Sequence, residues 1–154
     1  MVSSMELPDP APAAERLLPL ALARWRNAFR ELTAESTIPV ADVYDDAAVF
    51  EDPFRLVRGH EAIAAHFSKL NANLRRCRFE HARALVEGSE AALPWTMYLD
   101  LRRGPRKEIV VRGLSLIRFG ARVTCQRDLF DAGALVYEHV PVLGAAVRFV
   151  KRRL

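Results

Sequence analysis

The sequence predicts an α+β fold in which helices cover one face of a curved antiparallel sheet. Apolar residues recur at steps of three and four through much of the first 75 residues, which is typical of helices with one buried face. From residue 76 onward the apolar spacing changes to two, which is typical of half-buried strands. A last helical pattern opens at Pro141, so a C-terminal helix is expected after the strands.

The composition is that of a single globular domain. The chain has 154 residues, of which 51% are hydrophobic and 27% charged, and a domain of this size can bury a core without disulfides or metals. Its two cysteines, Cys77 and Cys125, cannot form a disulfide framework, and no apolar run reaches the ~20 residues of a membrane-spanning helix. We therefore expect a cytoplasmic protein, with residues 1–12 as a flexible lead-in and residues 13–154 as one domain.

The net charge of +4 is concentrated in the C-terminal tail. After Glu138 the chain has no acidic residue and four basic ones, namely Arg148, Lys151, Arg152 and Arg153. The rest of the chain is neutral, which argues against a nucleic-acid partner because such proteins track phosphates with a broad basic face. The tail has an apolar stripe and is interpreted as a helix docked on the domain or on a dimer; the alternative is contact with anionic membrane lipid. The stripe consists of Leu143, Val147, Val150 and Leu154.

Three helices and one strand are expected before residue 76. The first helix has Pro19 in its first turn, where no N–H is missed, and an apolar stripe of Leu18, Leu22, Trp25, Phe29 and Leu32. Ser36 or Thr37 can cap a short second helix that runs through Tyr44, and the run AAVFEDP predicts a strand that stops at Pro53. After a turn at Gly59, a third helix carries Ile63, Phe67, Leu70 and Leu74.

Four strand-like segments follow, at residues 76–87, 91–103, 108–119 and 122–130. A Gly-Pro turn joins the middle two into a long hairpin, and the four form an antiparallel meander. Because side chains alternate across a strand, Asp100 points away from the face that carries Trp95, Met97, Leu99 and Leu101. The next strand has a further apolar face, which consists of Val110, Leu114 and Leu116. We expect a second subunit to cover this face.

Two stretches resemble the nuclear transport factor 2-like superfamily. The first is similar to the helix–strand–loop–helix of bacterial ketosteroid isomerases and SnoaL-like polyketide cyclases, and reads VYDDAAVFEDPFRLVRGHEAIAAHF. The second is similar to the last hairpin of these proteins and of limonene-epoxide hydrolases, and reads RGLSLIRFGARVTCQRDLFD. The resemblance covers roughly residues 18–131. It implies a cone-shaped, cystatin-like roll, with a curved sheet wrapped around three N-terminal helices, a homodimer, and a hollow cavity for a small hydrophobic ligand or substrate.

The resemblance also implies roles for individual residues. Asp52 matches the general base of the isomerases, and Tyr44 matches a tyrosine of the hydrogen bonds that support it. The isomerases' oxyanion hole has no counterpart, because Ser115 stands in place of its carboxylic acid and the first helix offers no tyrosine. Asp128 matches the aspartate that activates water in limonene-epoxide hydrolases, whereas their Arg-x-Asp pair lacks its arginine near Asp100.

Asp52 is a candidate on physical grounds as well. It precedes a proline, so it is held in extended backbone between Phe50 and Phe54. Apolar neighbours are expected to raise the pKa of this carboxyl, which is how a base near neutrality is made. The alternative is an aspartate that caps the following loop.

Asp128 shares a strand face with Gln126 and Phe130. If helices cover that face, its carboxylate lies in the same cavity as Asp52, and the two would separate their pKa values into one acid and one base. The alternative is a salt bridge between Asp128 and a neighbouring arginine, Arg127 or Arg118.

His66 lies beside Phe67 on the third helix and is interpreted as a proton carrier or a polar anchor for a ligand; the alternative is a packed residue. The other histidines share no metal-ligand spacing, so no metal is expected, and no cofactor-binding fingerprint is present.

The catalytic candidates are thus Asp52, Asp128, Tyr44 and His66. The residues expected to contact a ligand are Phe50, Phe54, Trp95, Met97, Leu99, Ser115, Ile117, Gln126 and Phe130; the alternative is a core that they fill.

These features favour an enzyme of the isomerase, cyclase or epoxide-hydrolase type that uses an aspartate base in an apolar cavity. A non-catalytic ligand carrier and a dimeric interaction module without a ligand are the alternatives on the same fold.

Overall fold

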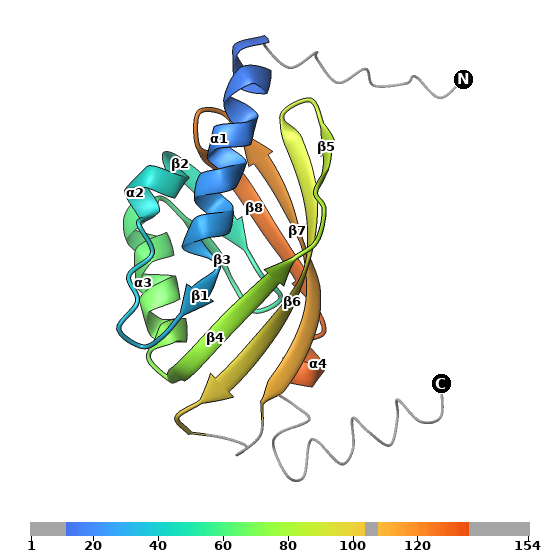
Figure 1. The fold of residues 1–154 in the computed structure, drawn as a ribbon. Coiled ribbons are helices and arrows are strands. Elements are labelled where there is room, and N and C mark those ends of the chain that lie inside the picture. Colours follow the sequence, from blue (N-terminus) through green and yellow to red (C-terminus); the bar gives the residue numbers. More distant parts are fainter. Residues whose placement is uncertain (1–11, 104–107, 136–154) are drawn as a thin grey trace, which may run out of the picture.

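The computed structural model describes residues 12–103 and 108–135 (Figure 1). Its helices are α1 (Pro12–Ala28), α2 (Val40–Val43), α3 (His60–Asn71) and α4 (Ala132–Leu135). Its strands are β1 (Glu31–Leu32), β2 (Tyr44–Glu51), β3 (Leu56–Arg58), β4 (Leu74–His81), β5 (Leu85–Glu87), β6 (Glu90–Leu101), β7 (Ile109–Phe119) and β8 (Val123–Phe130). The predicted helix from Pro141, the Gly-Pro turn and most of the lead-in lie outside the described residues.

One curled sheet organises the molecule and confirms the predicted α+β class. Its strand order is β1-β4-β6-β7-β8-β2-β3, with β5 paired to β6. The predicted meander is its centre, and β2 adds to it by pairing with β8 in parallel, which places Phe50 beside Gln126. Figure 1 shows the sheet curling so that α1 and α3 lie on its inner side. Within the described ranges, no helix is long and apolar enough to cross a membrane.

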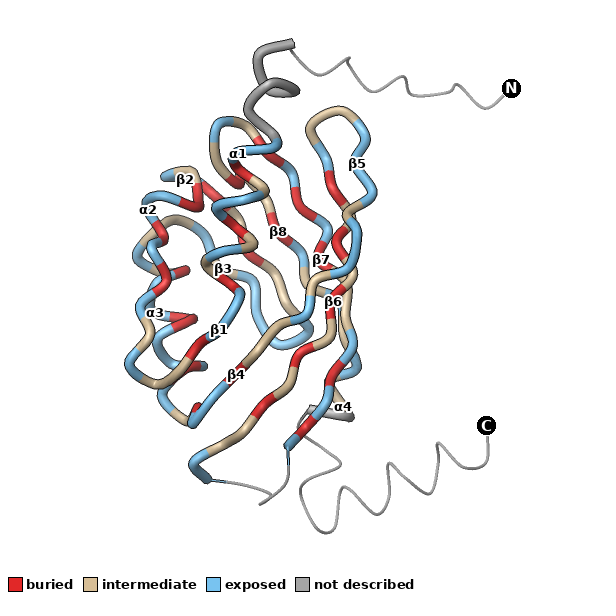
Figure 2. The backbone as a smooth tube through the Cα atoms, viewed as in Figure 1, coloured by how far each residue is buried: buried red, intermediate tan, exposed pale blue. Residues whose placement is uncertain are grey.

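Strand β6 shows how the sequence separates the inner and outer faces of this sheet. Its inward side chains are at most 9% exposed, as predicted, and are Leu93, Trp95, Met97 and Leu99. The alternation of buried and more exposed positions is visible along β6 and β7 in Figure 2. On β7, Val111 and Ile117 are buried, whereas Val110 and Leu116 are 49% and 40% exposed on the outer face. The inner face packs on α1 and α3 and forms the core.

Several expectations for the first two helices were wrong. Helix α1 begins at Pro12, so Pro19 lies inside it and not in its first turn, and the helix ends before Leu32, which pairs with β4 as part of β1. The Ser36 hydroxyl accepts the Thr33 N–H and does not cap α2, which has Pro39 at its N-cap and no side-chain cap. The four-residue α2 ends at Val43, before Tyr44, because β2 pairing takes over there.

Helix α3 and the strand after it also differ from the expectation. Leu70 is 50% exposed and Leu74 opens β4, whereas His66 and Asn71 are buried on the helix. The predicted strand over residues 76–87 is divided into β4 and β5, which pair with different parts of β6. The division falls opposite Pro94, which has no N–H to give to the ladder.

Gly113 leaves room for a tryptophan that supports the inner face. It pairs with Trp95 across β6 and β7, and a Cβ at this position would overlap the Trp95 six-membered ring. The ring is 5% exposed and cannot move into solvent without loss of its burial. We expect Gly113→Ala to destabilise the protein by about 1–3 kcal/mol, measured by chemical denaturation.

Gly120→Ala is the matched control for this substitution. A Cβ at Gly120 would make only ordinary contacts, the nearest with Thr124 at 3.7 Å, so its stability should stay near that of the wild type. Equal stabilities of the two variants would show that the close packing of Trp95 on Gly113 does not restrict the strand.

Candidate functional site

A cavity of about 350 Å³ lies inside the curl of the sheet, within the usual size range of small-molecule sites. Eight aromatic rings line it, from Trp25, Phe29, Phe50, Phe54, Phe67, Phe79, Trp95 and Phe130. The polar side chains of its wall are Asp52, Asn71, Asn73, Ser115, Gln126 and Asp128. The inner face is therefore hollow, and the interpretation of a completely filled core is wrong.

Asp52 lies where β2 turns back into β3. Its backbone N–H donates to the Arg55 carbonyl oxygen at 2.9 Å, and its Oδ1 accepts the N–H groups of Phe54 and Arg55 at 2.8 and 2.9 Å. These bonds close the hairpin, so the interpretation of Asp52 as a loop cap is confirmed.

The second oxygen of Asp52 is paired with a histidine. His66 Nε2 lies 3.0 Å from Asp52 Oδ2, and both side chains are only 5% exposed. Burial alone would raise the pKa of Asp52, but the hydrogen bonds of His66 and of the two backbone N–H groups outweigh it, so this pKa lies below its ordinary value. The expectation of a raised pKa for Asp52 was wrong, because it considered the aromatic neighbours and not the donors.

Asp128 is the carboxyl with a raised pKa. Its Oδ1 accepts hydrogen bonds from Ser115 Oγ at 2.6 Å and Gln126 Nε2 at 2.9 Å, and its Oδ2 accepts none from the described residues. Burial raises the pKa of Asp128 to about 6, and the negative charge of Asp52 contributes in the same direction. The two carboxyls thus have pKa values displaced in opposite directions.

The alternative of a salt bridge for Asp128 was wrong. Arg127 pairs with Glu51 at 3.2 Å and Arg118 with Glu90 at 2.7 Å, both on the outer face of the sheet. Asp128 forms no ion pair with any residue of the described ranges, so its hydrogen-bond donors are neutral.

Buried hydrogen bonds fix the donors of Asp128. Gln126 Oε1 accepts both the Trp25 indole N–H at 2.7 Å and the Tyr44 hydroxyl at 2.6 Å, so the amide N–H₂ of Gln126 must face Asp128. The Trp95 indole N–H donates to Ser115 Oγ at 2.9 Å, which leaves the Ser115 proton for Asp128. Burial raises the pKa of Tyr44, so this hydroxyl stays a donor.

Most of the predicted ligand contacts lie in the cavity wall: Phe50, Phe54, Trp95, Met97, Leu99, Ser115, Gln126 and Phe130. Ile117 is buried but lies outside this wall, next to a hollow on the outer face. Tyr44 and His66 are behind the wall and contact it through Gln126 and Asp52. Asp100 faces outward, as expected, and pairs with Arg75 at 3.1 Å.

The sequence did not indicate that Trp25 and Asn71 belong to this wall. Trp25 was expected only as part of a buried helical stripe, and its bond to Gln126 joins residues 101 positions apart. Asn71 is 3% exposed and lies one turn after Phe67 on the buried side of α3, but a stripe defined by apolar residues does not include an asparagine. Within the part of the chain that is described, no group of His, Cys, Asp or Glu side chains could hold a metal ion.

The chain matches the family model of the SnoaL-like domain over residues 23–122. No curated protein matches it significantly. A protein of Catenulispora acidiphila with a ketosteroid isomerase-like fold, solved in complex with trimethylamine, is 16% identical, with a TM-score of 0.66 over 80% of this chain and 93% of that one.

Two further solved structures have the same fold. An epoxide hydrolase of M. tuberculosis, similar to limonene-epoxide hydrolase, is 20% identical, with a TM-score of 0.62 over 88% of this chain and 95% of that one. A SnoaL-like protein of Jannaschia sp. CCS1, provisionally assigned as a polyketide cyclase, is 16% identical, with a TM-score of 0.67 over 82% of this chain and 93% of that one. At these identities the likeness concerns the fold.

The opposite pKa displacements predict opposite effects on stability. Because the pKa of Asp128 is about 6 in the folded state and near 3.8 in the unfolded chain, its ionisation destabilises the protein as the pH rises from 4 to 7. Asp128→Asn should therefore raise the free energy of unfolding at pH 8, on the order of 2–3 kcal/mol. Asp52→Asn should lower it, because the ionised Asp52 is stabilised in the folded state.

Thermal melts of the wild type and both variants between pH 3 and 8 measure these differences. The gain from Asp128→Asn should shrink below pH 6, and the loss from Asp52→Asn should shrink below pH 4. The same sign for both variants at pH 8 would contradict the assignment.

Proposed function

The chain belongs to the SnoaL-like domain family, and we propose that it is an enzyme that binds a small, predominantly apolar molecule and moves a proton with Asp128. Its fold is shared by an epoxide hydrolase and by proteins provisionally assigned as an isomerase and a polyketide cyclase. A likeness of fold does not select among these reactions, so the proposal rests on the site.

One observation carries the proposal: a single apolar cavity contains one carboxyl of low pKa and one whose pKa is about 6. A general base works best when its pKa is near the working pH, which Asp128 satisfies and Asp52 does not. Asp128 also has an oxygen that accepts no hydrogen bond from the described residues, whereas both oxygens of Asp52 are engaged. The role of base therefore passes from Asp52 to Asp128.

Asp52 and His66 have a supporting part in this mechanism. The Asp52 carboxylate is held in place by His66 and the hairpin N–H groups, and its charge contributes to the raised pKa of Asp128. Ser115 and Gln126 act in the other direction, because their hydrogen bonds favour the ionised form of Asp128. Cys77, the cysteine in the wall, is unsuited to nucleophilic attack because burial raises the pKa of its thiol to about 12.

Turnover should depend on Asp128. We expect the wild type to convert a member of one of two probe classes, β,γ-unsaturated ketones by isomerisation or aryl epoxides by hydrolysis, with a rate that rises as the pH passes through about 6. Asp128→Asn should lower kcat by roughly 10²–10⁴-fold. Asp100→Asn makes the same change on the outer face and should leave kcat unchanged.

Two further variants test whether the rise of the rate with pH, here called the limb, reports the ionisation of Asp128. Ser115→Ala removes a hydrogen bond that lowers the pKa of Asp128, so the limb should move to higher pH. Asp52→Asn removes a negative charge that raises it, so the limb should move to lower pH. A limb that neither variant moves would exclude Asp128 as the base, and binding of the probes without any turnover would indicate a carrier.

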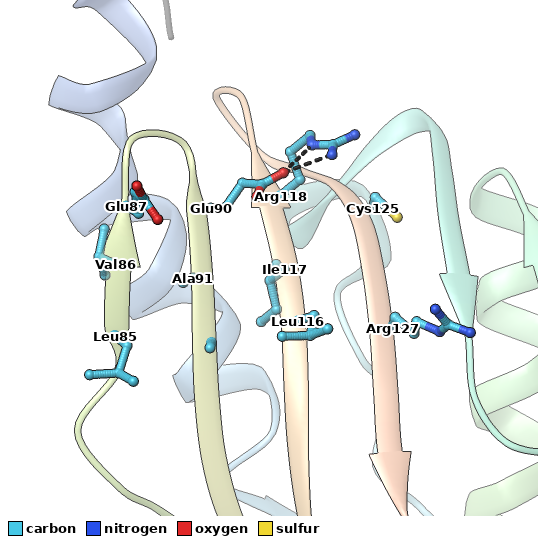
Figure 3. A pocket seen from close by; sticks show the side chains of 11 residues that line it. Leu85, Val86, Glu87, Glu90, Ala91, Leu116, Ile117, Arg118, Cys125 and Arg127 are labelled. Carbon is cyan, nitrogen blue, oxygen red and sulfur yellow. Dashed lines mark hydrogen bonds and ion pairs between the residues drawn. The ribbon is translucent and has the colours of Figure 1, made fainter. Parts of the chain in front are cut away.

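We also propose that the protein is a homodimer formed through the outer face of the sheet. This face carries an apolar patch, here called the outer patch, made of Leu85, Ala92, Pro94, Leu114, Leu116 and Leu129, which neighbour one another across β5–β8. Its leucines Leu85, Leu116 and Leu129 are 69%, 40% and 41% exposed. Figure 3 shows Leu85 and Leu116 level with each other on β5 and β7, with the Glu90–Arg118 ion pair farther along the strands. All four residues line a hollow of about 670 Å³. An apolar patch with a charged border is typical of a protein interface.

Light scattering at micromolar concentration should give twice the chain mass of 17.4 kDa. Leu116→Glu should shift the protein to the monomer, because two carboxylates would be buried without partners at a symmetric interface. Leu20→Glu is the control, since Leu20 is 59% exposed on α1 and lies outside the outer patch. A wild type found only as the monomer would exclude the dimer.

A further inference from the structure

The cavity wall has negative charge and no positive charge. Its lining residues include two carboxyls, those of Asp52 and Asp128, and no lysine, arginine or histidine. His66 is the basic side chain in contact with one of them, and its Nε2 faces Asp52. The hydrogen-bond donors of Asp128 are a hydroxyl and an amide, which are both neutral. A buried carboxylate without a cation is destabilising, so a positively charged ligand would relieve a cost that the protein already bears.

The rest of the wall suits a cation of one particular kind. Aromatic faces carry partial negative charge and attract a cation placed over them. Phe130 lies within 6.0 Å of Trp95, measured between ring centroids, and Trp95 in turn donates to Ser115 at the carboxyl. Leu99, Met97 and Leu101 continue the wall as aliphatic surface. Such a wall cannot solvate an inorganic ion, but it can enclose an alkylated ammonium group together with an apolar body.

We propose that the cavity binds an organic cation, a tertiary or quaternary ammonium group on an apolar body, with its positive charge against Asp128. This proposal rests on the proposed function, since it names the substrate class of the same cavity. A neutral molecule can enter the cavity but leaves the Asp128 charge without compensation, so it binds less tightly than the cation, and an anion would be repelled by both carboxylates. A primary ammonium has three N–H groups, most of which would face aromatic rings without an acceptor, whereas a tertiary ammonium has one that can donate to Asp128 and a quaternary ammonium has none.

The charge state of the site decides how binding depends on pH. The groups that face Asp128 are Asp52 from the β2–β3 loop, His66 from α3 and Tyr44 from β2. Asp52 stays ionised and Tyr44 stays neutral between pH 5 and 8, given the directions of their pKa values. Asp128 changes its charge in this range, because its pKa is about 6.

Two probes of the same shape test the proposal on the wild-type protein. Phenyltrimethylammonium and tert-butylbenzene differ by a charged nitrogen in place of a carbon, and calorimetry or the fluorescence of Trp25 and Trp95, the chain's two tryptophans, reports their binding. We expect the cation to bind at least about tenfold more tightly than the hydrocarbon at pH 8. Benzenesulfonate, the anionic control, should not bind.

The pH and one variant separate the Asp128 charge from other causes. At pH 5 the cation should bind about tenfold more weakly than at pH 8, since roughly one carboxyl in ten stays ionised one pH unit below its pKa. Binding of tert-butylbenzene should not weaken. Asp128→Asn should reduce the affinity for the cation about tenfold or more and should not weaken binding of the hydrocarbon, which gains from the loss of the uncompensated charge.

The outcomes distinguish the two proposals. Equal affinities for the cation and the hydrocarbon, or a preference for the hydrocarbon, would overturn the cation proposal and leave the cavity as an apolar ligand site. A preference for the cation that persists in Asp128→Asn would also overturn it, because the positive charge of the ligand would then not interact with Asp128. Failure of both probes to bind at either pH would contradict the proposed function itself.

Discussion

The amide of Gln126 is the constraint on which the site depends. Its oxygen receives hydrogen bonds from α1 and β2, and its nitrogen donates to Asp128 on its own strand. The side chain is 1% exposed, so none of these bonds can be exchanged for bonds to bulk water. Each such bond contributes about 1 kcal/mol on balance, but losing one partner would leave a buried polar group unsatisfied. The bonds therefore position the helix, the parallel strand pair and the carboxyl relative to one another.

Other features of the site lower stability. The cavity removes packing contacts from the centre of the domain, and the ionised Asp128 is buried without a basic partner within the described residues. Residues in the same region offset part of this: Trp95 fills the space above Gly113, and Asp52 closes the β2–β3 hairpin with its hydrogen bonds and pairs with His66. Natural proteins commonly retain destabilising groups at sites where function needs them.

The central strands and the positions of both aspartates were predictable, because strand alternation and the family resemblance depend on local sequence. Asp128 and Gln126 share an inward face by parity alone, as expected. The pKa of Asp52 was not predictable, since it depends on His66, 14 residues later, and on hairpin N–H groups whose direction only the folded loop sets. The parallel pairing of β2 with β8 likewise joins segments distant in sequence, and no local pattern encodes it. Ile117 was expected to line the cavity with other apolar strand residues; it is 2% exposed but lies outside the wall.

Phe54 lies at the edge of the cavity and also contributes to the pKa of Asp52. Its ring lines the cavity, yet the residue is 43% exposed, so it lies at the boundary between the cavity and solvent. Its backbone N–H is also one of the donors that keep Asp52 ionised. A molecule that moved the Phe54 backbone as it entered would weaken that hydrogen bond, and any resulting change in the charge of Asp52 would act on the pKa of Asp128. Entry and proton affinity are thus thermodynamically linked, so that the protein's affinity for a guest and its readiness to take up a proton must vary together.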